Sequence, residues 1–162
     1  MSDFHRVCLC LGSNVEPEKN LRSAVELLRA RGRVLRISTA WESAAVGSGG
    51  PNFLNACALF TTRLAAPELV DQVIRPIESS LGRRRSADRS APRQIDIDIV
   101  LYDEQPLRLE YWEQAFMIVP LSELLPEFRH PLTHEPLASI AGRLRLETWL
   151  EPRPSVLPVL ES

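Results

Sequence analysis

The chain has 162 residues, of which 44% are hydrophobic and 25% charged, and its formal net charge is −2. These values predict one globular domain with a sizeable core, and they argue against a general nucleic-acid binder or a membrane-spanning protein. Cys8, Cys10 and Cys57 lie in apolar runs without metal-ligand spacing, which is typical of a reduced, cytoplasmic protein.

Hydrophobic periodicity predicts the elements in chain order. Strands are expected at residues 7–11, 34–42, 53–62 and 95–102. Helices are expected to begin at Pro17 and Pro67 and to end near Gly32 and Gly82. The order strand, helix, strand, strand, helix, strand predicts an α+β fold, a ferredoxin-like β-α-β-β-α-β antiparallel sheet with helices on one face.

The chain after Asp103 is expected to add a short apolar segment, Phe116 to Leu125, and a last strand, Leu144 to Leu150. We therefore expect a single domain over residues 1–162. Its core covers about residues 5–130, and a C-terminal extension covers about residues 131–162.

The segment from Ile95 to Ile99 has the clearest chemical pattern in the sequence. Ile and Asp alternate in it, so Asp96 and Asp98 should point to one side of a strand and the isoleucines to the other. Two carboxylates about 6–7 Å apart repel each other unless a cation lies between them. Five arginines precede them: Arg83, Arg84, Arg85, Arg89 and Arg93. This combination favours a polyphosphate bound with Mg²⁺, although a solvated edge strand after an arginine-rich loop would give the same pattern.

Four motifs together resemble those of the 6-hydroxymethyl-7,8-dihydropterin pyrophosphokinases. They are Leu11-Gly12-Ser13-Asn14, Pro51-Asn52-Phe53-Leu54-Asn55-Ala56, Gly82-Arg83 and Ala91-Pro92-Arg93-Gln94-Ile95-Asp96-Ile97-Asp98-Ile99. The resemblance covers roughly residues 7–130 and implies the fold given above. It also implies an enzyme of the folate pathway that moves pyrophosphate from ATP to a pterin alcohol, giving AMP and the pterin diphosphate.

The resemblance also implies roles for individual residues. Asp96 and Asp98 would ligate two Mg²⁺ ions, and Arg83 and Arg93 would act on the ATP phosphates. The other residues expected at the nucleotide are Glu78, Arg85 and Ile99. Those expected at the pterin are Gly12, Ser43, Ala44, Ala45, Val46, Asn55 and the two rings Phe53 and Phe116, which would stack on its faces. Read alone, Asn55 could end a hydrogen-bond ladder, and Phe53 and Phe116 could be core residues.

One stretch departs from the family pattern. The family usually has a Pro-His motif shortly before an Arg-Ala-Phe or Arg-Gly-Phe triplet, and this His and Arg reach the ATP phosphates. Here residues 109–116 are shorter and acidic, Gln114 replaces the Arg, and the His has no counterpart. Arg108 or Arg129 could supply the missing charge.

The partners expected from the resemblance are a reduced pterin and ATP, with no nucleic acid and no membrane, for a monomer or weak homo-oligomer. Two alternatives stay open. The enzyme could act on a different pterin, or the chain could be a non-catalytic relative that binds a pterin or nucleotide.

Overall fold

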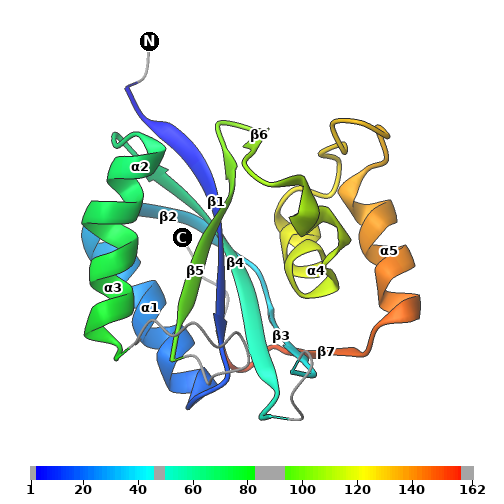
Figure 1. Cartoon of the computed structure of the whole chain (residues 1–162), viewed down its shortest axis with the longest axis horizontal. Coiled ribbons are helices and arrows are strands. Elements are labelled where there is room, and N and C mark those ends of the chain that lie inside the picture. Colours follow the sequence, from blue (N-terminus) through cyan, green and yellow to red (C-terminus); the bar gives the residue numbers. More distant parts are fainter. Residues whose placement is uncertain (1–2, 46–49, 83–93, 158–162) are drawn as a thin grey trace.

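A computed structural model of the chain describes residues 3–45, 50–82 and 94–157. Within these ranges the strands form one seven-stranded antiparallel sheet in the order β6-β5-β1-β4-β3-β7, with β2 also paired to β4 (Figure 1). The strands are β1 (His5–Ser13), β2 (Arg33–Ile37), β3 (Ala40–Ser43), β4 (Phe53–Thr62), β5 (Asp96–Tyr102), β6 (Gln105–Pro106) and β7 (Leu150–Arg153). The α-helices are α1 (Pro17–Arg31), α2 (Ala66–Leu69), α3 (Arg75–Ser80), α4 (Ala115–Leu124) and α5 (Leu137–Glu147). A π-helical segment (Val70–Ile74) joins α2 to α3, and a 3₁₀ helix (Leu109–Glu113) precedes α4.

The predicted ferredoxin-like core is confirmed: β5, β1, β4 and β2 lie side by side and antiparallel, and α1, α2 and α3 cover one face. The single strand expected at residues 34–42 is instead two strands, β2 and β3. The break falls at Ser38, whose backbone N–H donates to the Cys57 carbonyl at 2.9 Å and whose Oγ accepts the Cys57 N–H at 2.8 Å. The side chain thus takes a backbone position in the ladder, and the edge of the sheet bends there.

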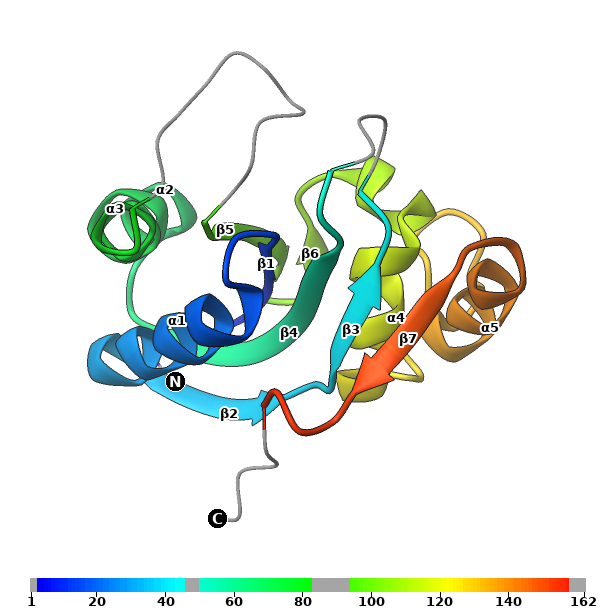
Figure 2. The same cartoon turned by 90° about the horizontal axis from the view of Figure 1, so that it is seen from below.

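Alternation along the central strands divides the core between the two faces of the sheet. On β4, Ala56, Ala58 and Phe60 pack toward α1 and α3, while Cys57 and Leu59 pack toward α4. Figure 2 shows the resulting layers, with α1, α2 and α3 on one side of the curved sheet and α4 and α5 on the other.

The C-terminal part of the chain covers the second face. The strand expected at Leu144 to Leu150 was wrong, because residues 137–147 form α5 and the strand β7 begins only at Leu150. Leu144 and Leu146 alternate with charged residues as in a strand, but Leu146 is 89% exposed. The buried positions are Leu137, Ile140, Ala141 and Leu144, which follow the helical spacing i, i+3, i+4, i+7.

None of the helices formed by the described residues combines the length and apolar content needed to cross a membrane.

Candidate active site

One row of residues crosses four strands at the end of the sheet where β4 begins. The strand register sets Trp41 opposite Asn55, Asn55 opposite Gly12, and Gly12 opposite Asp96. Directly opposed residues of an antiparallel pair lie on the same face, so Asn55 and Asp96 flank Gly12 on the face covered by α4. Asp98 is opposite Cys10 in the adjacent row of the same face.

Gly12 creates the space that the Asn55 side chain occupies. A Cβ atom at position 12 would lie 2.4 Å from Asn55 Nδ2 and 3.4 Å from its Cγ. A contact of 2.4 Å does not occur, so only glycine at position 12 lets the Asn55 carboxamide lie over β1 beside Asp96. Asn55 is 7% exposed, and its amide is therefore held at the inner edge of the site.

The turn after β1 is tied to the beginning of β5. Asn20 Nδ2, on α1, donates to the Val15 carbonyl and to Gln94 Oε1, the latter at 3.3 Å. A Cβ placed on Gly82, whose φ is 88°, would lie 3.7 Å from Gln94 Cγ. Gly82 and Gln94 are the described residues on either side of residues 83–93, and the Gln94 side chain lies near Gly82.

Four of the predicted site residues, Arg83, Arg85, Arg93 and Val46, lie outside the described residues. Two further predicted nucleotide contacts, Glu78 and Ile99, lie within them. Glu78 is 4% exposed, and its Oε2 accepts a hydrogen bond from the Ile97 N–H at 3.0 Å. Because Ile97 stands between Asp96 and Asp98, Glu78 fixes the strand that carries both carboxylates. The Ile99 side chain packs in the core on the opposite face.

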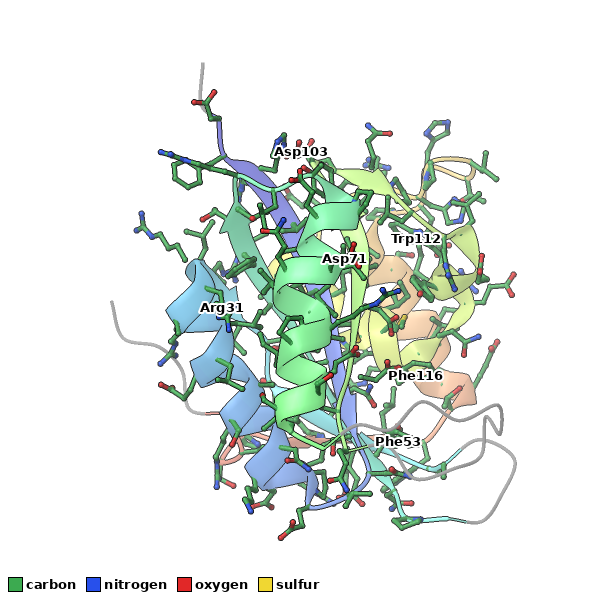
Figure 3. All side chains as sticks on the ribbon, turned by 60° about the vertical axis from the view of Figure 1, so that its left-hand side comes forward. Arg31, Phe53, Asp71, Asp103, Trp112 and Phe116 are labelled. Atoms are coloured by element: carbon green, nitrogen blue, oxygen red, sulfur yellow. The ribbon has the colours of Figure 1, made fainter. Side chains whose placement is uncertain are left out.

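The residues predicted to hold the pterin lie around the same end of the sheet. Ser43 is opposite Phe53 in the register of β3 and β4, and Phe53 is on the face of Asn55. Phe116 is in the first turn of α4, which covers that face. Both rings are partly buried, and both lie across the molecule from Arg31 (Figure 3). Ala44, just past β3, is exposed.

Tyr111 is a residue at this site that the sequence did not single out. Its hydroxyl donates to Asp98 Oδ1 across 3.4 Å. Burial, together with the nearby Asp98 charge, raises the pKa of Tyr111 to about 12, so the hydroxyl keeps its proton. The Arg108 guanidinium lies over the Tyr111 ring, 5.9 Å from the ring centroid. The sequence hinted at this contact only through the spacing of three residues between Arg108 and Tyr111, since positions i and i+3 align in a 3₁₀ helix.

Trp112 anchors the 3₁₀ helix that carries Tyr111. Its ring is 3% exposed and stacks on Phe128 with the centroids 5.8 Å apart. At the other end of α4, Glu123 Oε1 accepts a hydrogen bond of 2.6 Å from Trp41 Nε1. The segment from Tyr111 to Glu123 therefore crosses the sheet from β5 to β3 and closes one side of the site.

The two aspartates suit magnesium bound together with a polyphosphate. Asp96 and Asp98 are partly buried on one strand face, and no cluster of three potential metal ligands occurs within residues 3–45, 50–82 and 94–157. Mg²⁺ is commonly held by one or two carboxylates, with substrate phosphates and water completing its shell. The donor set therefore fits a metal that arrives with its substrate better than a closed structural site.

Comparison with known proteins gives a consistent result. Residues 8–126 match the family model described as 7,8-dihydro-6-hydroxymethylpterin-pyrophosphokinase (HPPK). A Synechocystis protein named 2-amino-4-hydroxy-6-hydroxymethyldihydropteridine pyrophosphokinase is 33% identical over 159 residues, which is 94% of this chain and 74% of that protein. A Pseudomonas aeruginosa protein of the same name is 35% identical over 140 residues, covering 79% of this chain and 85% of its own length.

Larger proteins also contain a similar region. The mitochondrial folate synthesis bifunctional protein of Arabidopsis thaliana is 34% identical over 135 residues, and the match spans 76% of this chain but only 24% of that protein. Among solved structures, Plasmodium falciparum HPPK-DHPS with pteroate matches with a TM-score of 0.68 at 10% identity, over 89% of this chain and 43% of that one. At this identity the structural match supports the fold alone.

Proposed function

The chain belongs to the 7,8-dihydro-6-hydroxymethylpterin-pyrophosphokinase family, ATP-using enzymes of folate synthesis, and we propose which reaction it performs and with which residues. The proposed reaction transfers pyrophosphate from ATP to the hydroxymethyl group of 6-hydroxymethyl-7,8-dihydropterin, giving AMP and the pterin diphosphate. The observation that carries it is the row Asn55, Gly12 and Asp96, because it sets a carboxamide for a heterocycle beside a carboxylate for metal-bound phosphates.

The pterin is held at the β3–β4 side of this row. Asn55 and the backbone of residues 43–46 hydrogen-bond the amide and amino edge of the ring, which has donors and acceptors fixed in one plane. Phe53 and Phe116 stack on its two faces. The partly buried position of both rings on the α4 face supports this assignment.

The phosphates are held at the β5 side. Asp96 and Asp98 hold two Mg²⁺ ions, which when bound neutralise the charge on the ATP oxygens. Arg83 and Arg93 stabilise the charge that develops during transfer, and Arg85 lies along the nucleotide. Glu78 and Ile99, predicted as nucleotide contacts, have buried side chains and act on the nucleotide by positioning β5. The pterin hydroxyl oxygen attacks the β-phosphorus, the bond from that phosphorus to the oxygen bridging to the α-phosphate breaks, and the hydroxyl proton passes to water.

Arg108 takes over part of the phosphate binding that the family's His and Arg perform and that residues 109–116 of this chain lack. It precedes the 3₁₀ helix and lies over the Tyr111 ring, and Tyr111 contacts Asp98. Only the Tyr111 side chain therefore separates the Arg108 guanidinium from the metal-binding Asp98, which suits a residue that binds the metal-bound phosphates. Gln114 adds a neutral donor, which is weaker than a charged one.

The cysteines bear on the cellular environment of the enzyme. Cys8, Cys10 and Cys57 are free and buried, which supports a reducing, cytoplasmic environment. We propose that the chain forms one domain and acts as a monomer or weak homo-oligomer on small-molecule substrates.

The test is the nucleotide product. The protein is incubated with Mg²⁺-ATP, with and without 6-hydroxymethyl-7,8-dihydropterin, and the nucleotides are separated by chromatography. AMP formed in step with the pterin diphosphate, and only when the pterin is present, supports the proposal. ADP as the pterin-dependent product would indicate transfer of a single phosphoryl group and would contradict it.

A further inference from the structure

A cavity lies at the far end of β4 from the candidate active site. Its volume is about 620 Å³, and its lining includes Phe4, Arg31, Arg33, Arg63, Leu64 and Val73. It also includes Thr61 and Thr62, the last residues of β4, whereas Phe53 begins that strand. Nine steps of about 3.3 Å separate the two ends by roughly 30 Å, so the cavity is distinct from the site around Gly12.

A glycine brings two arginines to the cavity. Arg31 ends α1, and Arg33 begins β2 opposite Thr61. A Cβ on Gly32, between them, would lie 2.4 Å from Phe60 Cζ and 2.8 Å from the Thr61 carbonyl oxygen. Any side chain at position 32 would therefore force the end of α1 away from β4. The glycine lets both arginines reach the rim on which Arg63, after β4, also lies.

Two of the guanidinium groups have structural supports. Pro76 has no N–H, so the Gln72 carbonyl lacks its usual α-helical partner four residues ahead. Arg31 Nη1 donates to this carbonyl oxygen at 3.3 Å. The Arg63 guanidinium lies over the Phe4 ring, 4.6 Å from its centroid. The rim therefore has defined positions for positive charge.

The charge at this rim is not balanced by neighbouring acids. In the described part of the chain, no carboxylate lies within ion-pair distance of Arg31, Arg33 or Arg63, whereas several other arginines have such a partner: Arg22, Arg29, Arg75, Arg143 and Arg153. Of the three described acids close in sequence to the cavity wall, Asp3 adjoins Phe4 and makes no ion pair with these arginines, and the other two are already engaged. Asp71 pairs with Arg75 at 3.0 Å, and Glu68 accepts the Ala65 N–H at 3.1 Å.

We propose that this cavity binds a small aromatic anion, a planar ring that carries a phosphate or a carboxylate. Three cations that line one cavity repel one another, and a bound anion relieves that repulsion. Guanidinium forks match both phosphate and carboxylate oxygens. The apolar wall of Phe4, Leu64 and Val73 suits a ring, and the volume is that of a small-molecule site. The site is independent of the proposed pyrophosphokinase reaction.

The test is an NMR titration of the ¹⁵N-labelled protein with phenyl phosphate, with benzoate and with inorganic phosphate, each without Mg²⁺. The expected result is saturable shifts of the Gly32, Thr62 and Leu64 amides with both aromatic anions, and weaker binding of inorganic phosphate. The Gly12 and Asp98 amides report the other site and should not move. Amide shifts confined to Gly12 and Asp98, or a linear response without saturation, would overturn the proposal.

Matched variants identify the responsible charges. The double variant Arg33→Gln, Arg63→Gln should weaken binding of phenyl phosphate at least tenfold. The control, Arg29→Gln with Arg75→Gln, removes the same charge from two arginines that already have carboxylate partners. The amide spectrum of each variant is compared with that of the wild type to check that the variant is folded. An equal loss in the control would reduce the effect to net charge, and inorganic phosphate binding as tightly as phenyl phosphate would exclude a role for the ring.

Discussion

Gly12→Ala should weaken pterin binding by acting through Asn55. The added Cβ would lie 2.4 Å from Asn55 Nδ2, about 1 Å closer than a van der Waals contact allows, so the carboxamide has to turn away. The expected loss is one or two hydrogen bonds to the pterin, about 1–3 kcal/mol. This corresponds to a rise of about 5- to 150-fold in the pterin Kd, measured by calorimetry with a non-hydrolysable ATP analogue.

The fold should tolerate the change. Gly12 lies in β1 without a positive φ, so its backbone conformation suits alanine. Alanine also lowers the conformational entropy of the unfolded chain, which offsets part of the cost of moving Asn55. The matched control is Gly142→Ala, at a glycine inside α5 where a Cβ meets nothing within 4 Å. It should raise the free energy of unfolding by up to about 1 kcal/mol, because it replaces a helical glycine, and leave the Kd unchanged.

A double-mutant cycle decides whether Gly12 acts through Asn55. If it does, Gly12→Ala should cost little further affinity in an Asn55→Ala background, since the displaced group is already gone. An unchanged Kd for Gly12→Ala, or losses that add fully in the double variant, would refute this reasoning.

Three further variants test the phosphate side of the site. Tyr111→Phe should weaken Mg²⁺ binding in the presence of the ATP analogue by about tenfold or less, because it removes one modest hydrogen bond to Asp98. Its melting temperature should stay within a few degrees of the wild type. Unchanged metal affinity would exclude a role for Tyr111 in positioning Asp98. Arg108→Ala should raise the KM for ATP, and adding Gln114→Arg should restore part of it; an Arg108→Ala enzyme with wild-type kinetics would rule out compensation. Arg83→Ala should lower kcat by about 10²–10³-fold with little change in pterin Kd, as expected for a charge acting on the transition state; a large loss of pterin binding with kcat preserved would contradict that role.

The sequence predicted the sheet and one side of the site because both depend on local alternation. The Ile–Asp pattern of residues 95–99 placed the isoleucines in the core and the two carboxylates on the opposite face, as the structure has them. The break at Ser38 was missed because it depends on a hydrogen bond to Cys57, nineteen residues away. The pattern of Leu144 and Leu146 suggested a strand because a short window cannot separate period 2 from one face of a helix.

Contacts between distant segments could not be predicted from the sequence. The place of Tyr111 beside Asp98 depends on Trp112 packing against Phe128, which fixes the rotation of the 3₁₀ helix. Gly12 was selected from its motif, but its function as space for Asn55 depends on the register of β1 against β4. Such contacts are set by tertiary packing, which periodicity does not encode.

Counting the divalent ions bound at Asp96 and Asp98 is the most direct test that these residues form the metal site. Mn²⁺, followed by electron paramagnetic resonance in the presence of the ATP analogue and the pterin, serves as the probe for Mg²⁺. We expect two bound ions in the wild type and loss of tight binding in Asp96→Asn and Asp98→Asn. The control Asp103→Asn, at the far end of β5, should bind as the wild type does. Two tightly bound ions in both aspartate variants would contradict the assignment of this strand as the metal site.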